Sequence, residues 1–573
     1  MKVLCLLALS CTLASPALAI DREAFTFTRY DLNATIDPDQ QRFGVRGKVT
    51  LRNDSDSPQY NVVLQISSTL HWLSIQVGGK PAEFVAQAYN SDIDHTGALS
   101  EAIVTLPRPI PPKDAIEISV GYEGVIPLDA TRQTRIGVPA DTAKHSDWDQ
   151  ITPAFTAVRG IGHVAWYPIA SEAANISDAS TVSEAVGRWQ RRAANSEMRV
   201  NLCLAPTTSS LTLLMNDAAG ASTGADTAGD AAKCTEHFFS RIGEPAPFFV
   251  AGSYAESQNV DAMIHYLPRH KSGADDYMLA LQQVGPWLAS WLGNHQAKGV
   301  KTQVIDLPDA ADSPFQAGTT LLIPLTGTDT SYLLAAVHQL TSITFPAPRQ
   351  WVSGGLALYA QARYMQDQKG AGAGLAYLRL NDDVLIDSEK RNLASGAENA
   401  AQHSLINDDD EFYVGPKAMR AWWMLHDLVG ETAFTAALRR YKPEEDTDAL
   451  HVQKLFEAES HHDLTWFFDD WVYRDRGLPD FRIASVYSRQ VLGGGQLVTV
   501  TVENLGAVAA EVPVTLHMAA GDATEKLIVP GKSKASVRIL AASAPLTATV
   551  NDGSVPETDM SNNSYTIESP TSK

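Results

Sequence analysis

The chain has 573 residues and a formal net charge of −21 at pH 7. This length exceeds what a single hydrophobic core supports, so we expect two to four domains. Proteins that bind nucleic acid present a basic face, and the strong negative charge argues against that class of partner.

Residues 1–19 have the pattern of a signal peptide. Lys2 precedes an apolar run, and Ala17-Leu18-Ala19 forms a cleavage site with small residues at its first and third positions. We therefore expect an exported protein, periplasmic or secreted, whose mature chain starts at Ile20. Acylation of Cys11 is the alternative. No later run reaches the roughly 20 apolar residues that a membrane-spanning helix needs.

Removal of the signal peptide leaves two cysteines, Cys203 and Cys234. An even pair in an oxidising compartment favours a disulfide, and two free thiols are the alternative. Both cysteines lie in strand-like segments around a stretch, residues 216–232, that consists mainly of Asp, Ala, Gly and Thr. A bridge there would restrain the unfolded chain by about 3 kcal/mol.

The first predicted domain, residues 20–253, has the pattern of an antiparallel β structure. Apolar and polar residues alternate between turns, as in residues 30–36 and 116–122. The segment 163–168, HVAWYP, is rich in aromatic residues. We interpret His163 as a packed or surface residue rather than a functional one.

The second predicted domain, residues 254–479, is mainly helical. It has a helix at 277–292, a short strand-like segment at 300–305, an extended apolar run at 315–325, and helices to about residue 476. One helix, 417–429, ends before Gly430, which is a plausible C-cap. The tryptophans of this domain are interpreted as core residues, with a ligand-stacking site as the alternative.

The third predicted domain, residues 480–573, is a β-sandwich of the immunoglobulin type. Residues 496–504 and 512–518 alternate cleanly, and further strands are expected at 525–529 and 535–540. About seven short strands in some 90 residues are typical of such a sandwich.

The centre of the chain contains two helices around a proline break, 335–344 and 351–364, with Pro346 and Pro348 between them. In zinc peptidases of the thermolysin type, the first such helix carries H-E-x-x-H. Two imidazoles four residues apart bind one metal, and the Glu acts as the base on the metal-bound water.

The layout resembles the membrane alanyl aminopeptidase (aminopeptidase N) family of gluzincin zinc peptidases. Three segments carry the resemblance: 163–168, which is like the family's W-[FY]-P; 338–359, which is like H-E-x-x-H followed by W-x-x-E-G-x-A-x-Y; and 466–479, which is like W-F-F-x-x-W…G-x-P. The gap from Ser342 to Trp351, between the two parts of the central motif, is shorter here than in the family. The resemblance implies a multidomain α+β protein, with a β-rich N-terminal domain, a thermolysin-like domain and a C-terminal β-sandwich.

Carried over residue by residue, the resemblance implies a degenerate active site. Of three zinc ligands only His338 matches, because Ser342 and Gly354 stand at the other two positions and Gln339 stands at the general-base position. Tyr413 is a candidate for the family's transition-state-stabilising tyrosine.

The edge strand that binds the substrate's α-amine in the family is also altered. Residues 316–320 hold no carboxylate here, and a neutral amide cannot form the charge-assisted bond to an ammonium group.

The sequence therefore predicts an inactive pseudopeptidase that holds no cofactor and binds a peptide or protein partner. One alternative is an active zinc peptidase that recruits substitute ligands. The histidines that it would draw on are His163, His403, His426, His461 and His462. A second alternative is a structural or adhesive envelope protein in which the β domains carry the function.

Overall fold

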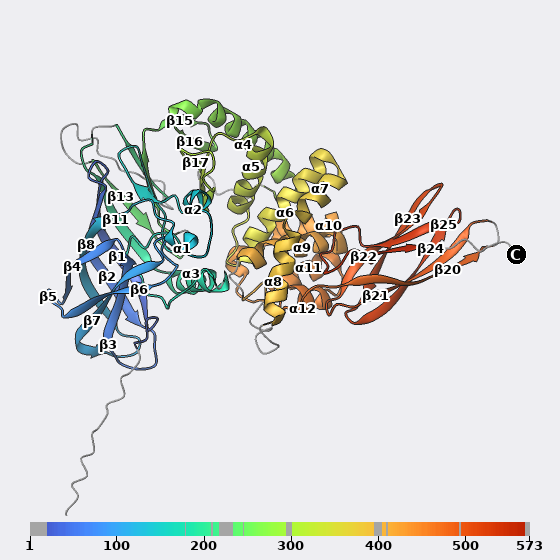
Figure 1. Ribbon diagram of the computed structural model, residues 1–573, viewed down its shortest axis with the longest axis horizontal. Helices are drawn as coiled ribbons and strands as arrows, with labels where there is room; N and C mark the ends of the chain where they lie inside the picture. Colours follow the sequence, from blue (N-terminus) through green and yellow to red (C-terminus); the bar gives the residue numbers. More distant parts are fainter. Residues whose placement is uncertain are drawn as a thin grey trace, which may run out of the picture.

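A computed structural model of the chain describes residues 20–177, 179–207, 210–216, 233–243, 246–293, 301–394, 404–407, 411–491 and 494–567. The predicted signal peptide and Cys11 lie outside these residues. Figure 1 shows three parts in a row: a β-rich N-terminal part, a helical centre and a β-structured C-terminal part. This is the predicted multidomain α+β architecture.

Three sheets build the N-terminal part. They have the strand orders β13-β11-β1-β2-β8-β4-β5, β12-β14-β10-β9 and β3-β7-β6. The strands are β1 (Phe25–Asp37), β2 (Arg42–Asn53), β3 (Gln59–Ser67), β4 (Leu70–Val77), β5 (Lys80–Pro81), β6 (Phe84–Asn90), β7 (Ala98–Ile110), β8 (Ala115–Val125), β9 (Gln150–Ile151), β10 (Phe155–Val158), β11 (Glu197–Leu204), β12 (Thr212–Met215), β13 (Lys233–Phe239) and β14 (Phe249–Gly252). The described ladders are antiparallel except for the parallel pair of β1 with β11.

The aromatic segment 163–168 lies in the core of this part. The indole of Trp166 donates to the carbonyl of Pro247 (3.0 Å), and its ring packs edge-on against Phe249. Three helices also occur here that were not predicted, α1 (Thr131–Thr134), α2 (Ala140–Ser146) and α3 (Ala179–Ala193). In α3, Ala185, Trp189 and Ala193 recur at helical spacing and are buried. This helix was not recognised from the sequence because strand-like segments surround it.

The central part begins with a five-stranded sheet of order β15-β16-β17-β19-β18. Its strands are β15 (Ala255–Gln258), β16 (Ala262–Tyr266), β17 (Thr302–Asp306), β18 (Phe315–Ala317) and β19 (Thr320–Ile323). The inner pairs are parallel and the two outer strands are antiparallel. The predicted extended run at 315–325 is thus a hairpin turned at Gly318, whose φ of +57° favours glycine.

Nine described helices complete the central part. They are α4 (Lys271–Leu292), α5 (Asp329–Thr344), α6 (Gln350–Lys369), α7 (Ala371–Leu378), α8 (Asp382–Ala394), α9 (Glu411–Val429), α10 (Glu431–Arg440), α11 (His451–Ser460) and α12 (Thr465–Trp471). Short 3₁₀ turns occur at Pro268–His270, Arg379–Asn381 and Pro443–Glu445.

Helices α4, α5 and α9 begin before their predicted first residues 277, 335 and 417. A capping box between Thr328 and Ser331 starts α5. Helix α9 includes Pro416, which directly precedes the predicted start. Its end agrees with the prediction, because the amide of Gly430 donates to the carbonyl of His426 (2.9 Å) with a φ of +79°.

Seven described strands form the C-terminal sandwich. They are β20 (Phe481–Gln490), β21 (Gln496–Asn504), β22 (Ala510–Met518), β23 (Gly521–Val529), β24 (Ser533–Ala541), β25 (Pro545–Val550) and β26 (Ser564–Thr566). They pair as β20-β21-β24 and β23-β22-β25-β26, two antiparallel sheets as predicted. Val498, Val500 and Val502 point inward and are fully buried, which explains the clean alternation of β21.

One continuous hydrophobic core runs from the central helices into the C-terminal sandwich, and a separate core fills the N-terminal part. A smaller cluster joins the N-terminal part to the central sheet, with Trp148 and Phe155 on one side and Ile305 and Leu322 on the other. The predicted domain boundaries fall between β14 and β15 and between α12 and β20. No helix in the described part of the chain is long and apolar enough to cross a membrane.

Candidate functional site

His338 lies on α5 beside the edge strand β18. Its Nδ1 is 3.2 Å from the amide oxygen of Gln316, which can only accept, so Nδ1 carries the proton and donates. No hydrogen bond from a described residue reaches the second ring nitrogen, Nε2. Burial lowers the pKa of His338 to about 4, so the imidazole is neutral at pH 7.

Gln339, the residue at the predicted base position, is fully buried and points into the sheet. Its amide nitrogen donates to the carbonyls of Gln303 (2.9 Å) and Thr319 (3.4 Å), and its amide oxygen accepts from the hydroxyl of Tyr277 (2.8 Å). A carboxylate could accept from Tyr277 but could not donate to the two carbonyls. The environment therefore selects an amide rather than a base.

The other two ligand positions offer no free donor to a metal. The hydroxyl of Ser342 donates to the carbonyl of His338 one turn earlier (3.0 Å). At Gly354 the space that a side chain would take is filled by Gln350, whose amide nitrogen lies 2.9 Å from where a Cβ would be.

A zinc site in a peptidase needs three protein donors of the nitrogen, oxygen or sulfur type around an open position. Around His338 the described residues bring one imidazole, one neutral amide and one hydroxyl already bonded to backbone. Among described residues, one group has three His, Cys, Asp or Glu donor atoms close together, and it consists of His145, Asp309 and Asp312 rather than His338. The residues at the His338 site do not fit zinc.

Tyr413, the candidate transition-state stabiliser, belongs to a different cluster. Its hydroxyl accepts from the ammonium group of Lys417 (2.8 Å), which also donates to Glu389 (2.7 Å) and Asp475 (3.0 Å). All four side chains are buried. None of the described hydrogen bonds or ring contacts of Tyr413 reaches His338.

The two carboxyl groups of this cluster, Glu389 and Asp475, differ in protonation. Burial raises the pKa of Glu389 to about 8, although Lys417 works in the opposite direction. Burial would also raise the pKa of Asp475, but Lys417, the Glu389 side chain and the amide of Gly477 together outweigh it and lower the value to about 2. Near neutral pH, Lys417 and Asp475 are thus the charged pair and Glu389 is protonated. The cluster ties α8 and α9 to the segment that leads into the C-terminal sandwich.

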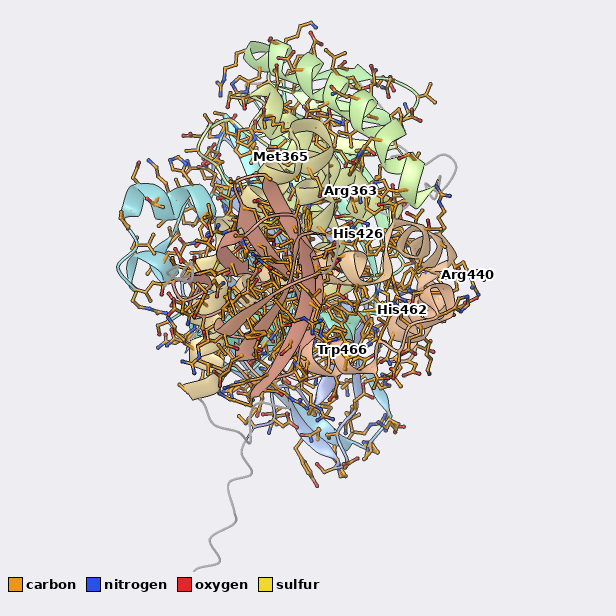
Figure 2. The ribbon with its side chains drawn as sticks, turned by 90° about the vertical axis from the view of Figure 1, so that its right-hand side faces the viewer. Arg363, Met365, His426, Arg440, His462 and Trp466 are labelled. Atoms are coloured by element: carbon orange, nitrogen blue, oxygen red, sulfur yellow. A yellow bond between two sulfur atoms is a disulfide. The ribbon has the colours of Figure 1, made fainter. Side chains whose placement is uncertain are left out.

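The histidines proposed as substitute ligands do not gather around His338. His163 packs edge-on against Phe315 of β18 (5.3 Å), and His426 is bonded to Glu431 (2.9 Å) and lies beside Arg363 (Figure 2). His461 and His462 are exposed at the end of α11. His403 lies outside the described residues.

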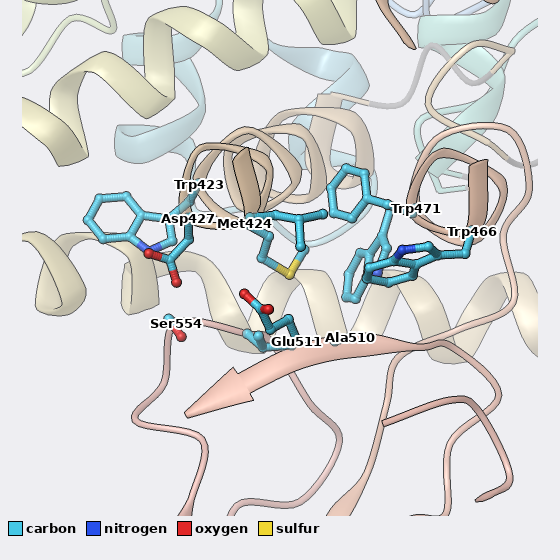
Figure 3. A pocket seen from close by; sticks show the side chains of 11 residues that line it. Trp423, Met424, Asp427, Trp466, Trp471, Ala510, Glu511 and Ser554 are labelled. Carbon is cyan, nitrogen blue, oxygen red and sulfur yellow. The ribbon is translucent and has the colours of Figure 1, made fainter. Parts of the chain in front are cut away.

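The two best-defined hollows lie away from His338. One, of about 550 Å³, is lined by Trp287 and Trp291 of α4 and by Arg363 and Glu431. The other has room for about one water, at about 10 Å³, and lies between α9, α12 and β22 (Figure 3). Trp423 and Trp466 line it and Trp471 is fully buried, so these tryptophans are largely packing residues.

The predicted disulfide is present between Cys203 on β11 and Cys234 on β13. The two residues are direct partners in the antiparallel ladder, with their Cα atoms 4.0 Å apart. The chain between them does not form a simple hairpin, because β12 pairs in a different sheet.

The sequence analysis did not predict several contacts of these sites. The contact of Gln316 with His338 depends on how β18 lies against α5, and the pairing of Lys417 with Glu389 and Asp475 joins residues far apart in the chain. The available signal was Lys417, a charged residue among the apolar residues of the helix 417–429, which indicates a buried partner of opposite charge.

Comparisons with known proteins support the architecture. No protein-family model matches the chain, and no curated protein sequence matches it. Its structure is similar to that of Legionella pneumophila aminopeptidase A, solved in complex with aspartic acid, with a TM-score of 0.60 and 12% identity over 93% of this chain. An M1 zinc metallopeptidase from Deinococcus radiodurans matches 80% of this chain and 96% of its own, with a TM-score of 0.48 and 15% identity.

The present chain spans 59% of the Legionella protein's length. At such low identity the likeness shows a fold shared with the Legionella protein and says nothing by itself about activity.

Proposed function

We propose that the chain is an exported pseudopeptidase that binds a peptide or protein segment without hydrolysing it. The observation that carries this proposal is the hydrogen bonding of the Gln339 side chain. Its amide is engaged by two carbonyls and a tyrosine hydroxyl in the core, so the side chain at the base position cannot take a proton from a metal-bound water. The His338 site also supports the proposal, because one imidazole alone is too few ligands for a zinc ion.

The chemistry of hydrolysis fails at two independent steps with these residues. Peptide hydrolysis at neutral pH needs a water whose pKa is lowered toward 7, which a bound metal ion supplies. It also needs a group that takes the proton of that water, and a glutamine side chain has no such capacity. Loss of both functions together is consistent with a site retained for binding.

A partner segment would bind along β18. This strand lies at the end of the five-stranded sheet, so one side of its backbone has no partner strand among the described residues. An extended peptide can add to such an edge through main-chain hydrogen bonds. Beside the edge, the Nε2 of His338 offers an acceptor to a peptide N–H, because Nδ1 carries the proton.

The test uses the mature chain, residues 20–573, in two assays. A panel of aminoacyl-naphthylamides measures hydrolysis, and a library of free and N-acetylated peptides measures binding. We expect no chelator-sensitive hydrolysis. Peptide binding should fall about tenfold in His338→Ala, since one hydrogen bond is lost. His71→Ala, a matched change at an exposed histidine of β4, should leave binding unchanged.

Hydrolysis that is abolished by a chelator and by His338→Ala would contradict the proposal and favour an active metallopeptidase. Absence of binding to every peptide, or binding that a deletion of residues 256–478 leaves intact, would favour a structural role of the β parts.

A further inference from the structure

The junction between the N-terminal part and the central sheet holds a second set of chemically distinctive residues. His145 lies in the last turn of α2, and Asp309 and Asp312 lie in the segment between β17 and β18. Backbone contacts fix the two segments together, because the amide of Ser313 donates to the carbonyl of His145 (2.8 Å). The indole of Trp148 in turn donates to the carbonyl of Ser313 (3.0 Å).

The three side chains bring their donor atoms to one point. The Nδ1 of His145 is 3.0 Å from Oδ1 of Asp312 and 4.0 Å from Oδ1 of Asp309, and all three donor atoms lie within 4.8 Å of one another. Zinc bonds nitrogen and oxygen at about 2.1 Å, so ligand atoms in a tetrahedral site are about 3.4 Å apart. The two distances from His145, 3.0 and 4.0 Å, lie on either side of this value.

The protein balances the charges of the group only in part. In the described structure, the direct ion pairs of Asp309 and Asp312 are with His145, whereas the neighbouring Lys144 is paired with Asp141 (2.6 Å) and interacts with the two carboxylates at longer range. Asp312 is 7% exposed. Two carboxylates thus face one imidazole at the edge of a buried junction, and a divalent cation would compensate them.

We propose that His145, Asp309 and Asp312 form a zinc site that joins the N-terminal part to the central sheet. The imidazole favours zinc over calcium or magnesium, which prefer oxygen ligands alone. Three protein ligands leave a position for water.

The experiment is a Zn²⁺ titration of the mature chain after treatment with a chelator and dialysis, followed by calorimetry. Co²⁺ absorption provides a second readout that reports the ligand geometry. We expect one equivalent of zinc per chain. Asp309→Asn and His145→Ala should each weaken binding more than ~100-fold, since loss of a direct ligand exceeds the effect of losing an outer partner.

Asp309→Asn is the main variant because Asp309 is half exposed, and an asparagine oxygen keeps its hydrogen bond to the amide of Ala311 (3.0 Å). His338→Ala is the matched control and should bind zinc as the wild type does. No binding, or binding that both junction variants leave unchanged, would overturn the inference. Binding lost in His338→Ala alone would overturn it as well and would point to the His338 site.

Discussion

Gln339 shows how one side chain can decide between catalysis and packing. A glutamine has both a donor and an acceptor, and this one uses both in the core, where a glutamate could satisfy only Tyr277. Reverting it to the residue that catalysis needs would therefore leave a carboxylate against two carbonyl oxygens.

We predict that Gln339→Glu lowers the free energy of unfolding by about 2–4 kcal/mol at pH 7 and produces no hydrolysis. The cost comes from a buried charge whose neighbours cannot donate to it. Urea unfolding measures the change. Gln316→Glu is the control, because that partly exposed side chain can still accept from His338, and its effect should stay within about 1 kcal/mol. Equal stability of the two variants would contradict this explanation.

Glu389 gives a pH-dependent prediction. Its pKa of about 8 in the folded protein exceeds its ordinary value of 4.5, so the folded state binds more protons than the unfolded state between these values. Its contribution to stability is complete below about pH 4.5 and is lost as the pH rises through 8.

Glu389→Gln imitates the protonated acid and should remove this dependence. We expect the variant to match the wild type near pH 6 and to lose less stability between pH 7 and pH 9, as measured by unfolding midpoints across that range. Parallel pH profiles for the two proteins would show that Glu389 is ionised in the fold.

Two adjacent glycines of α6, Gly354 and Gly355, have different environments, and only Gly355 contacts α9. A Cβ at Gly355 would lie 2.5 Å from the Cβ of Ala418, whereas a Cβ at Gly354 would meet only the movable end of Gln350. The close approach of the two helices thus depends on Gly355, and the loss of a ligand at position 354 costs the packing nothing.

We predict opposite effects for the two alanine substitutions. Gly355→Ala should lower the unfolding free energy by about 1–3 kcal/mol, because the helices must move apart. Gly354→Ala should be neutral or stabilising by up to about 1 kcal/mol, because alanine favours the helix. Thermal unfolding of both variants is the measurement, and a reversed order would contradict the packing described here.

The disulfide joins neighbouring strands β11 and β13 at the border of the seven-stranded sheet. Replacing Cys203 and Cys234 together by alanine should lower the unfolding free energy by about 3 kcal/mol, since the unfolded chain gains the freedom of a closed loop. Urea unfolding of the oxidised wild type and the double variant tests this. Reducing agent should then affect only the wild type.

Helices and strands could be predicted from the sequence where a local pattern of apolar residues determines them. The alternation in β21 and the helical spacing of α6 needed no tertiary information. The start of α9 did not follow, because a proline is unfavourable inside a helix and Pro416 directly precedes the predicted start, whereas α9 continues through it to Glu411. The pairing of Cys203 with Cys234 was predictable from the number of cysteines, but not their position in one ladder.

The site was predictable at the level of residue types only. The sequence places Gln339 one residue after His338 and so implies an absent base. It could not indicate that the amide turns into the sheet, because its partners Tyr277, Gln303 and Thr319 come from three other segments. The junction group around His145 is likewise created by the packing of two distant parts.

At the scale of the molecule, three parts are held by different means. The helical centre and the sandwich share one hydrophobic core, whereas the N-terminal part meets the centre through a smaller cluster and the His145 group. The strand that carries Gln316 lies at that junction. The partner segment that we propose to bind at β18 would therefore be positioned by both parts.

The most direct test of the central claim is the zinc content of the Asp309→Asn variant, measured by elemental analysis after dialysis against excess zinc and then buffer. This variant disables the junction group and leaves the surroundings of His338 intact. We expect no stoichiometric zinc, because His338 stands without two further ligands. One equivalent of zinc that disappears when His338→Ala is added would show a working metal site at α5 and contradict the account.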